Sequence, residues 1–275
     1  MTDVNDTFVA ELVAAGVERR EARWLVEEFV PGGDVDAAIA LRQAAARRLG
    51  GEPLQYIIGH WPFRTLDLDV DDRVLIPRPE TEELVDIALK ELAVSGAAAP
   101  IIVDLGTGSG AIGLSLLAEL AQRGVAASLV ALDESPDALD VARRNAAKHR
   151  LFAASFVRSS WFSSLDESLR GRVDLVVANP PYVGEEEFET LDPVLRYEPY
   201  GALVAGDARG VAGFSDLEII ISEAPAWLRE NGVLVCEHAN IHGTVASELA
   251  RSVGFREVDD LADLAGQSRV LVARR

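Results

Sequence analysis

The most constraining feature of this sequence is a series of short β-rich runs that begins just after Pro100. Seven runs follow one another, most of them separated by helical patterns: IIVDL, SLVALD, ASFVRS, VDLVVAN, VLVCEH, GFREVD and RVLVA. Strands that alternate with helices are typical of a doubly wound, mostly parallel α/β sheet, in which ligands bind outside the carboxyl ends of the strands. The residues that directly follow each run are therefore the first candidates for a functional site.

The residues before this series follow other patterns. From Asp6 to about Gly50, apolar residues recur at helical spacing in FVAELVAAGV, ERREARWLVEEFV and VDAAIALRQAAARRLG, which predicts a small bundle of three helices. The next stretch contains the alternating LDLDV, aromatic residues and prolines at both ends, which favours a hairpin-like connector over a helix. We predict a helical domain over residues 1–52, a β-hairpin connector over 53–76 and the sheet domain over 77–275.

Charge and composition limit the partners of such a chain. The formal net charge is -19, whereas proteins that hold a long polyanion gather Lys and Arg for its phosphates. The only cysteine, Cys236, cannot form an intramolecular disulfide, and the acidic amino terminus does not resemble a signal peptide. No apolar run reaches the roughly 20 residues that cross a bilayer. We expect a cytoplasmic monomer that binds neither a membrane nor, stably, nucleic acid.

A glycine-rich loop follows the first core strand. In DLGTGSGAIGL, Gly106, Gly108 and Gly110 allow the backbone to turn sharply and to approach a ligand at the start of a helix. Glycines alone are a weak signal, because a tight strand-to-helix turn also needs them. The spacing differs from the G-x-G-x-x-G of dinucleotide binders, and no Walker lysine follows, which disfavours a triphosphate.

An acidic residue, Asp133, ends the second strand, where a carboxylate can accept hydrogen bonds from both ribose hydroxyls of a nucleoside. A nucleoside bound without a phosphate cradle is best matched by S-adenosylmethionine. Trp161 and Phe162, after the third strand, provide an apolar slot for adenine, although an ordinary core aromatic fits the position of Trp161 equally well. The predicted cofactor-binding residues are Asp104, Gly106, Thr107, Gly108, Ser109, Gly110, Asp133, Trp161 and Asn179.

The motif NPPY follows the fourth strand and so faces the same crevice as the glycine loop. A planar nitrogen is hard to methylate because its lone pair is delocalised; two acceptors for its N–H groups raise its electron density and aim the lone pair. Asn179 can offer its side-chain oxygen and Pro180 its carbonyl, which Pro181 holds in an extended conformation. Tyr182 supplies a flat face. We predict a two-acceptor clamp for an NH₂ group, with Asn179, Pro180 and Tyr182 as the catalytic residues.

Two other groups of residues invite a functional interpretation. Cys236, Glu237, His238 and His242 lie close in sequence, but the cysteine belongs to the apolar run VLVC and the histidines share no clear helix face. We therefore predict packing or surface positions for them, and no metal site. The acidic run GEEEFE, directly after NPPY, is expected to form a solvated loop over the active site that can select for basic residues near the target.

With the glycine loop and NPPY in place, the chain resembles a class I methyltransferase, and most closely the HemK-like peptide-chain release factor glutamine methyltransferases. The resemblance extends in family order over nearly the whole chain, and its segments EPLQYIIG and VLIPRPETEELV are more specific than NPPY. It also includes DLGTGSGAIGL, ALDESPDALDVARRNA, WFSSL, DLVVANPPYV, EPYGALVAGDARG and AGQSRVLVA.

The resemblance implies a Rossmann-like fold with a seven-stranded, mostly parallel sheet and an S-adenosylmethionine-dependent activity. The implied reaction methylates the side-chain amide nitrogen (N5) of the glutamine in the Gly-Gly-Gln loop of release factors, in support of translation termination. The helical domain is implied to dock the release factor, and Arg78, Glu80 and Thr81 to border the cleft. The predicted substrate-binding residues are Asn179, Pro180, Pro181, Tyr182, Arg78 and Glu80.

This chain departs from the family pattern at three positions: Ser160 replaces an Asp at the adenine end, and Ala239 and His242 replace a Gly and a Gln. Two other functions fit parts of the sequence. An adenine-N6 methyltransferase on nucleic acid uses the same NPPY clamp, but the acidity of the chain and the lack of a Lys/Arg-rich recognition segment disfavour it. A non-catalytic binding module with this fold is disfavoured by the intact glycines, Asp133 and NPPY.

Overall fold

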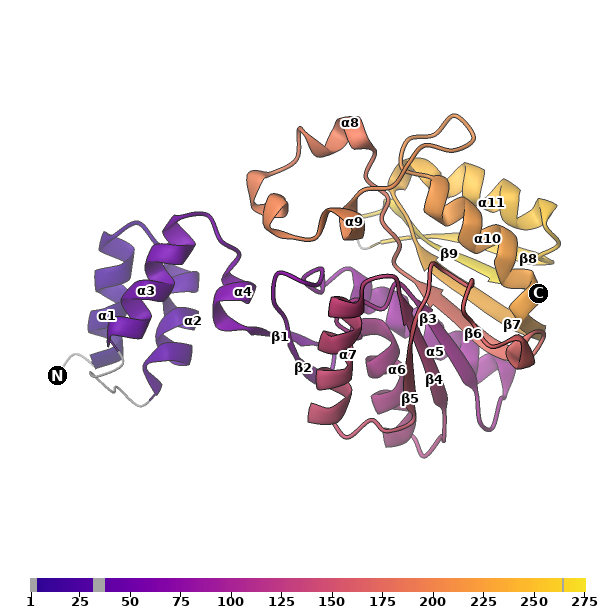
Figure 1. Ribbon diagram of the computed structural model, residues 1–275, viewed down its shortest axis with the longest axis horizontal. Helices are drawn as coiled ribbons and strands as arrows, with labels where there is room; N and C mark the ends of the chain where they lie inside the picture. Colours follow the sequence, from indigo (N-terminus) through magenta and orange to yellow (C-terminus); the bar gives the residue numbers. More distant parts are fainter. Residues whose placement is uncertain (1–3, 32–37, 264) are drawn as a thin grey trace.

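The computed structural model describes residues 4–31, 38–263 and 265–275 (Figure 1). A small helical bundle stands apart from a larger α/β domain, and a short helix and a β-hairpin join the two. The predicted division of the chain at residues 52 and 76 into three parts stays a prediction. Among the described residues, no helix is long and apolar enough to cross a membrane.

The bundle contains the helices α1 (Val4–Ala14), α2 (Arg19–Phe29) and α3 (Ala38–Leu49). Their apolar faces share one buried cluster, which confirms the predicted amphipathic helices. The start of the third predicted helix, together with most of the PGGD segment before it, lies outside the described residues. Arg48 of α3 forms a two-pronged ion pair with Glu21 of α2, at 2.8 and 2.9 Å.

The connector differs in part from the predicted hairpin. Its first residues form one helical turn, α4 (Leu54–Ile58), so the prediction of no helix here is wrong for these five residues. Pro53 fixes the entry of the turn, and Gly59 ends it in the left-handed conformation while its N–H donates to Gln55 O at 2.8 Å. The antiparallel hairpin of β1 (His60–Phe63) and β2 (Leu66–Asp69) then follows as predicted.

The α/β domain is built on a seven-stranded sheet of order β5-β4-β3-β6-β7-β9-β8, in which β9 is antiparallel to both of its neighbours and the other pairs are parallel. The seven predicted runs all form strands of this sheet. Their bounds are β3 (Ile101–Leu105), β4 (Ser128–Asp133), β5 (Ala154–Arg158), β6 (Val173–Ala178), β7 (Leu228–Glu237), β8 (Glu257–Ala262) and β9 (Ser268–Arg274). All six residues of β6 are buried, because helices cover both faces.

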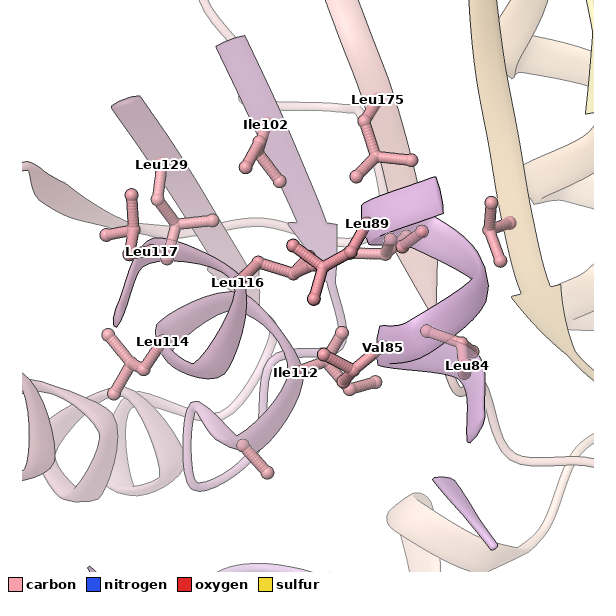
Figure 2. Packing of buried hydrophobic residues seen from close by; sticks show 14 of the residues in the cluster. Leu84, Val85, Leu89, Ile102, Ile112, Leu114, Leu116, Leu117, Leu129 and Leu175 are labelled. Atoms are coloured by element: carbon pink, nitrogen blue, oxygen red, sulfur yellow. The ribbon is translucent and has the colours of Figure 1, made fainter. Parts of the chain in front are cut away.

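Two apolar layers enclose the sheet. On one face, α5 (Thr81–Ser95) and α6 (Ala111–Gln122) pack against β3, β4 and β6, as Figure 2 shows for side chains such as Leu89, Leu116 and Ile102. On the other face lie α10 (Ser215–Trp227) and α11 (Gly243–Ser252). The helix α7 (Pro136–Lys148) packs against β4, β5 and the hairpin strand β2.

The chain order places a topological switch point between β3 and β6, because β4 and β5 continue to one side of β3 and β6 begins the other. The segment after β6 extends away from the sheet and carries α8 (Glu185–Phe188) and α9 (Tyr200–Leu203). It reaches the end of the bundle, where the Tyr197 hydroxyl donates to Gly50 O at 3.1 Å. The crevice at the switch point is thus bordered by this segment as well as by the strand ends.

Candidate functional site

A cavity of about 620 Å³ lies at the carboxyl ends of β3, β4, β5 and β6. Its wall combines the loops after these strands with the segment after the hairpin, the α9 segment and the start of α10. The lining residues are Arg73, Val74, Leu75, Gly106, Gly108, Asp133, Glu134, Ser135, Ala138, Ser159, Ser160, Trp161, Asn179, Pro181, Pro199, Gly201, Ala202, Val204, Asp216 and Ile219. Gly106, Gly108, Asp133, Trp161 and Asn179 were predicted to bind cofactor, and the structure brings them to this one wall.

The glycine loop takes its shape from its backbone. Gly106, Gly108 and Gly110 have φ values of 66°, 55° and 86°, in the left-handed region that favours glycine. Gly106 and Gly108 line the cavity, whereas Thr107, Ser109 and Gly110 are not among its lining residues. Thr107 and Ser109 are buried: the Thr107 N–H donates to Leu132 O at 2.9 Å, and Ser109 O accepts from Asn145 Nδ2 at 2.9 Å.

Asp133 is fixed at the end of β4 by two backbone donors. Its Oδ2 accepts from Gly108 N and its Oδ1 from Ser135 N, both at 2.9 Å. Burial raises the pKa of this carboxyl group, and the two N–H donors oppose the rise. Each carboxylate oxygen has a further lone pair, so Asp133 can still accept from hydroxyl groups in the cavity.

Asp104 was predicted to bind the cofactor, but it is fully buried beneath the glycine loop and is not among the residues that line the cavity. Its Oδ2 accepts from Thr107 Oγ1 at 2.7 Å and from Gly113 N at 3.0 Å, which draws the carboxylate under the loop. Oδ1 is buried and has no hydrogen-bond partner among the described residues. Burial raises the pKa of Asp104 to about 6. Buried carboxylate oxygens usually accept from a donor, and an ordered water molecule or the ammonium group of a ligand can supply one.

Trp161 and Asp216 form the end of the cavity that follows β5. Trp161 leaves the strand with a φ of 45°, and its Nε1 donates to Asp216 Oδ1 at 3.1 Å. Asp216 is part of the first turn of α10; burial raises its pKa, and the indole N–H opposes this rise. Phe162 turns the other way and stacks on Trp227 in the core, with ring centroids 5.9 Å apart. Only Trp161 of the predicted aromatic pair therefore contributes to the apolar slot.

The NPPY motif leaves β6 between the cavity and the end of β7. Asn179 and Pro181 line the cavity, and no described residue donates a hydrogen bond to the Pro180 carbonyl. The Tyr182 hydroxyl lies 3.4 Å from Glu237 Oε1, a long hydrogen bond; burial and the charge of Glu237 raise the pKa of Tyr182 to about 12. A side chain at position 213 would place its Cβ 2.3 Å from Tyr182 O. Because Gly213 has no side chain, the backbone just before α10 can lie against the NPPY motif.

The Asn179 side chain is held on one side by the first residue of α5. Asn179 Nδ2 donates to Thr81 Oγ1 at 3.2 Å, and Thr81 Oγ1 donates to Glu237 Oε2 at 2.8 Å. Thr81 and Glu237 are both buried. Among the described residues, nothing donates to Asn179 Oδ1, so this oxygen is free to accept from a ligand. From the sequence, Glu237 was expected only at a packed or surface position, because its partner Thr81 lies 156 residues away and no local pattern links the two.

The two predicted residues of the IPRPET segment lie in different settings. Arg78 forms a close ion pair with Glu198, whose other oxygen accepts from Ile76 N at 3.0 Å. This contact fastens the segment before α5 to the segment that carries α9. Glu80 precedes α5 and is exposed. Neither lines the cavity, and their substrate-binding roles stay predictions.

The cysteine and histidine residues near the end of β7 are packed, as predicted. Cys236 is a buried free cysteine, and His238 and His242 are also buried. The His242 Nε2 atom lies 2.8 Å from Ala212 O, and His238 Nδ1 lies 2.9 Å from Ala239 O. Within the described ranges, no cluster of three or more His, Cys, Asp or Glu residues is placed to hold a metal ion.

The donor set of the cavity fits S-adenosylmethionine. Its volume falls in the range of roughly 300–1,000 Å³ that is typical of small-ligand sites. Arg73 is the basic residue among the lining residues and is paired with Asp71 at 2.7 Å, so the wall offers carboxylates and an indole rather than a phosphate cradle. A carboxylate suits ribose hydroxyls, and a flat aromatic ring suits adenine.

Comparison with known families and solved structures agrees with this site. A family model described as a methyltransferase domain matches residues 98–264. A 16S rRNA methyltransferase of T. thermophilus, solved with AdoMet and guanosine, has a TM-score of 0.55 at 18% identity over 78% of this chain and 49% of its own. A methyltransferase from Pyrococcus furiosus has a TM-score of 0.51 at 17% identity over 85% of this chain and 96% of its own. The chain is therefore a methyltransferase with the class I fold.

Sequence relatives define the family more narrowly. Release factor glutamine methyltransferases from Vibrio cholerae and Burkholderia pseudomallei are 37% and 40% identical, over 86% and 90% of this chain and 78% and 85% of their own lengths. The corresponding enzyme from Chlorobaculum tepidum is 43% identical over 82% of this chain and 75% of its own. This chain belongs to the release factor glutamine methyltransferase family.

Proposed function

We propose that this protein transfers a methyl group from S-adenosylmethionine to the side-chain amide nitrogen of the glutamine in the Gly-Gly-Gln loop of peptide-chain release factors. The observation that carries the proposal is the pair of unoccupied acceptors after β6, Asn179 Oδ1 and the Pro180 carbonyl, beside a nucleoside-type cavity. Membership of the family supports the choice of substrate.

The clamp acts on the electrons of the amide nitrogen. Two hydrogen bonds from its N–H groups, to Asn179 and to Pro180, counteract delocalisation of its lone pair and aim that lone pair along one direction. S-adenosylmethionine supplies an electrophilic methyl group, and its sulfur keeps the electron pair of the broken bond. Once methylated, the nitrogen is acidic and releases a proton to water, so the clamp needs no strong general base.

The cofactor is held, in this proposal, by polar groups at one end and by a flat surface at the other. Asp133 accepts from the ribose hydroxyls, and the Gly106–Gly108 backbone lies beside the methionine portion. Trp161 covers one face of adenine. Asp216, on the same wall, accepts from the exocyclic amine of adenine through Oδ2, which has no other partner among the described residues. Asp216 thus supplies a carboxylate at the adenine end, where the family pattern has an Asp at the position of Ser160.

The helical bundle and the segment after NPPY are the proposed docking surfaces for the release factor. The bundle ends beside this segment, at the Tyr197–Gly50 contact. Glu185, Glu186 and Glu187 are exposed directly after the clamp, which favours a basic peptide next to the target glutamine. Arg78 and Glu80 directly precede α5, and we propose that they contact the release factor.

The test combines binding with transfer. Calorimetry measures binding of S-adenosylmethionine to the protein, and intact-mass spectrometry follows a purified release factor incubated with both. The proposal predicts cofactor binding and a gain of one methyl group by the release factor, but none by adenine-containing DNA or RNA oligonucleotides. Binding without transfer to the release factor would refute the substrate, and methylated oligonucleotide would support the adenine-N6 alternative. No binding would identify a non-catalytic module.

A further inference from the structure

We propose that Glu237 and Thr81 form an anchor that fixes the rotational state of the Asn179 amide, so that its oxygen and not its nitrogen faces the substrate. This inference deepens the proposed function and rests on it. Glu237 and Thr81 are positioning residues: they touch no reacting atom and act through Asn179.

The anchor joins three elements that are distant in sequence. Thr81 is the first residue of α5, Asn179 follows β6, and Glu237 ends β7. Their contacts run in series, from Asn179 Nδ2 to Thr81 Oγ1 at 3.2 Å and from Thr81 Oγ1 to Glu237 Oε2 at 2.8 Å. Glu237 is 3% exposed and Thr81 4%, so water does not compete for these groups.

The direction of the hydrogen bonds follows from what each group can donate. An ionised carboxylate only accepts, so Thr81 must give its single hydroxyl proton to Glu237. The Thr81 oxygen can then only accept from Asn179, which requires the NH₂ end of the amide to face Thr81. Asn179 Oδ1 is thereby directed away from α5, as an acceptor.

A flipped amide would abolish the clamp. An asparagine side chain carries an acceptor at one end and two donors at the other, and the two ends have nearly the same shape. In the flipped state, Nδ2–H groups would face the N–H groups of the target amide, and two donors cannot bind each other. Shape alone does not select the correct orientation of the amide. The carboxylate of Glu237, linked to Asn179 through two successive hydrogen bonds, does select it.

Charged and hydroxyl groups around Glu237 adjust the anchor. Burial raises its pKa, while the Thr81 hydrogen bond and the charge of Arg269 lower it, and Glu80 raises it. The Tyr182 hydroxyl also faces Glu237, at 3.4 Å, so one carboxylate contacts Tyr182 directly and Asn179 through Thr81. Protonation would let Glu237 donate to Thr81 and would remove the directional constraint.

The experiment compares Thr81→Val with Thr81→Ser, and Glu237→Gln with the unaltered protein. Thr81→Val keeps the shape of the side chain and removes its hydroxyl group, whereas Thr81→Ser keeps the hydroxyl group. We expect Thr81→Val and Glu237→Gln to lower kcat about 10- to 100-fold, the scale seen when a group that orients a binding residue is lost. The Kd for S-adenosylmethionine is expected to stay within about twofold, and Thr81→Ser to retain most of kcat. An unchanged kcat in Thr81→Val would overturn the proposal.

Two further readouts separate positioning from a general defect. In an Asn179→Ala background, Thr81→Val is expected to cause no further loss, because it acts only through Asn179; an additive loss contradicts this. NMR of the Asn179 side-chain NH₂ signals, assigned by their disappearance in Asn179→Ala, requires no substrate. We expect shifted and broadened signals in Thr81→Val. Unchanged NMR signals in Thr81→Val would refute the anchor, whether or not the protein methylates a release factor. Failure of the unaltered protein to methylate a release factor would refute only the proposed function.

Discussion

Replacement of Asp104 by Asn is expected to change how folding stability depends on pH. Asp104 is fully buried, and burial raises its pKa from 3.8 to about 6. The folded state therefore binds a proton at higher pH than the unfolded state does, so this group stabilises the fold increasingly as pH falls through about 6. A rise of about two pKa units corresponds to about 3 kcal/mol in all, of which about 1.4 kcal/mol develops between about pH 7.5 and about pH 5.

Urea unfolding of the original protein and of Asp104→Asn, at a series of pH values, measures this contribution as a difference. The original protein should gain about 1.4 kcal/mol relative to the variant between about pH 7.5 and about pH 5. Glu223→Gln is the matched control, because it removes the charge of an exposed carboxylate on α10. A difference that does not change with pH, or one that changes in the opposite direction, would refute the inference that burial raises the pKa of Asp104.

Three other predictions concern the cavity and the NPPY motif beside it. Asp133→Asn should weaken S-adenosylmethionine binding about 10- to 100-fold by calorimetry, because hydrogen bonds to a charged acceptor are lost; unchanged affinity would exclude Asp133 from the ribose site. Gly213→Ala should destabilise the fold by about 1–3 kcal/mol in urea unfolding, because φ is 66° and the new Cβ would meet Tyr182 O at 2.3 Å; Gly171→Ala, with open space at its Cβ and φ 71°, controls for strain alone. Asp216→Asn should reduce the binding preference for S-adenosylhomocysteine over S-inosylhomocysteine about tenfold, and Ser160→Asp in the Asp216→Asn background should restore this preference. If Glu134→Gln, and not Asp216→Asn, abolishes the preference, the adenine amine contacts Glu134.

Much of the fold could be predicted because the sheet is covered on both faces. Strands such as β6, with every residue buried, are continuous apolar runs, and helical segments separate most of them along the chain. The helix α4 was missed because a single turn is too short to show a helical period. Its existence depends on Pro53 and Gly59 at its ends and on burial of Leu54 and Ile57 against the bundle.

The site was predictable where a residue directly follows a strand and unpredictable where partners are distant. Asp133 and Asn179 reach the cavity because parallel strands end at the same edge. Trp161 and Phe162 are adjacent and similar, and only the backbone turn at Trp161 decides which of them faces the cavity. The partner of Thr81 lies 156 residues away and that of Arg78 lies 120 residues away, separations that no local pattern specifies.

The most direct test of the two-acceptor clamp is tandem mass spectrometry that locates the transferred methyl group in the release factor. We predict one methyl group on the side-chain amide nitrogen of the Gly-Gly-Gln glutamine, and a strongly reduced yield of it when Asn179→Ala replaces the original protein under identical conditions. Methylation of a different residue, or equal methylation by Asn179→Ala, would contradict the two-acceptor clamp.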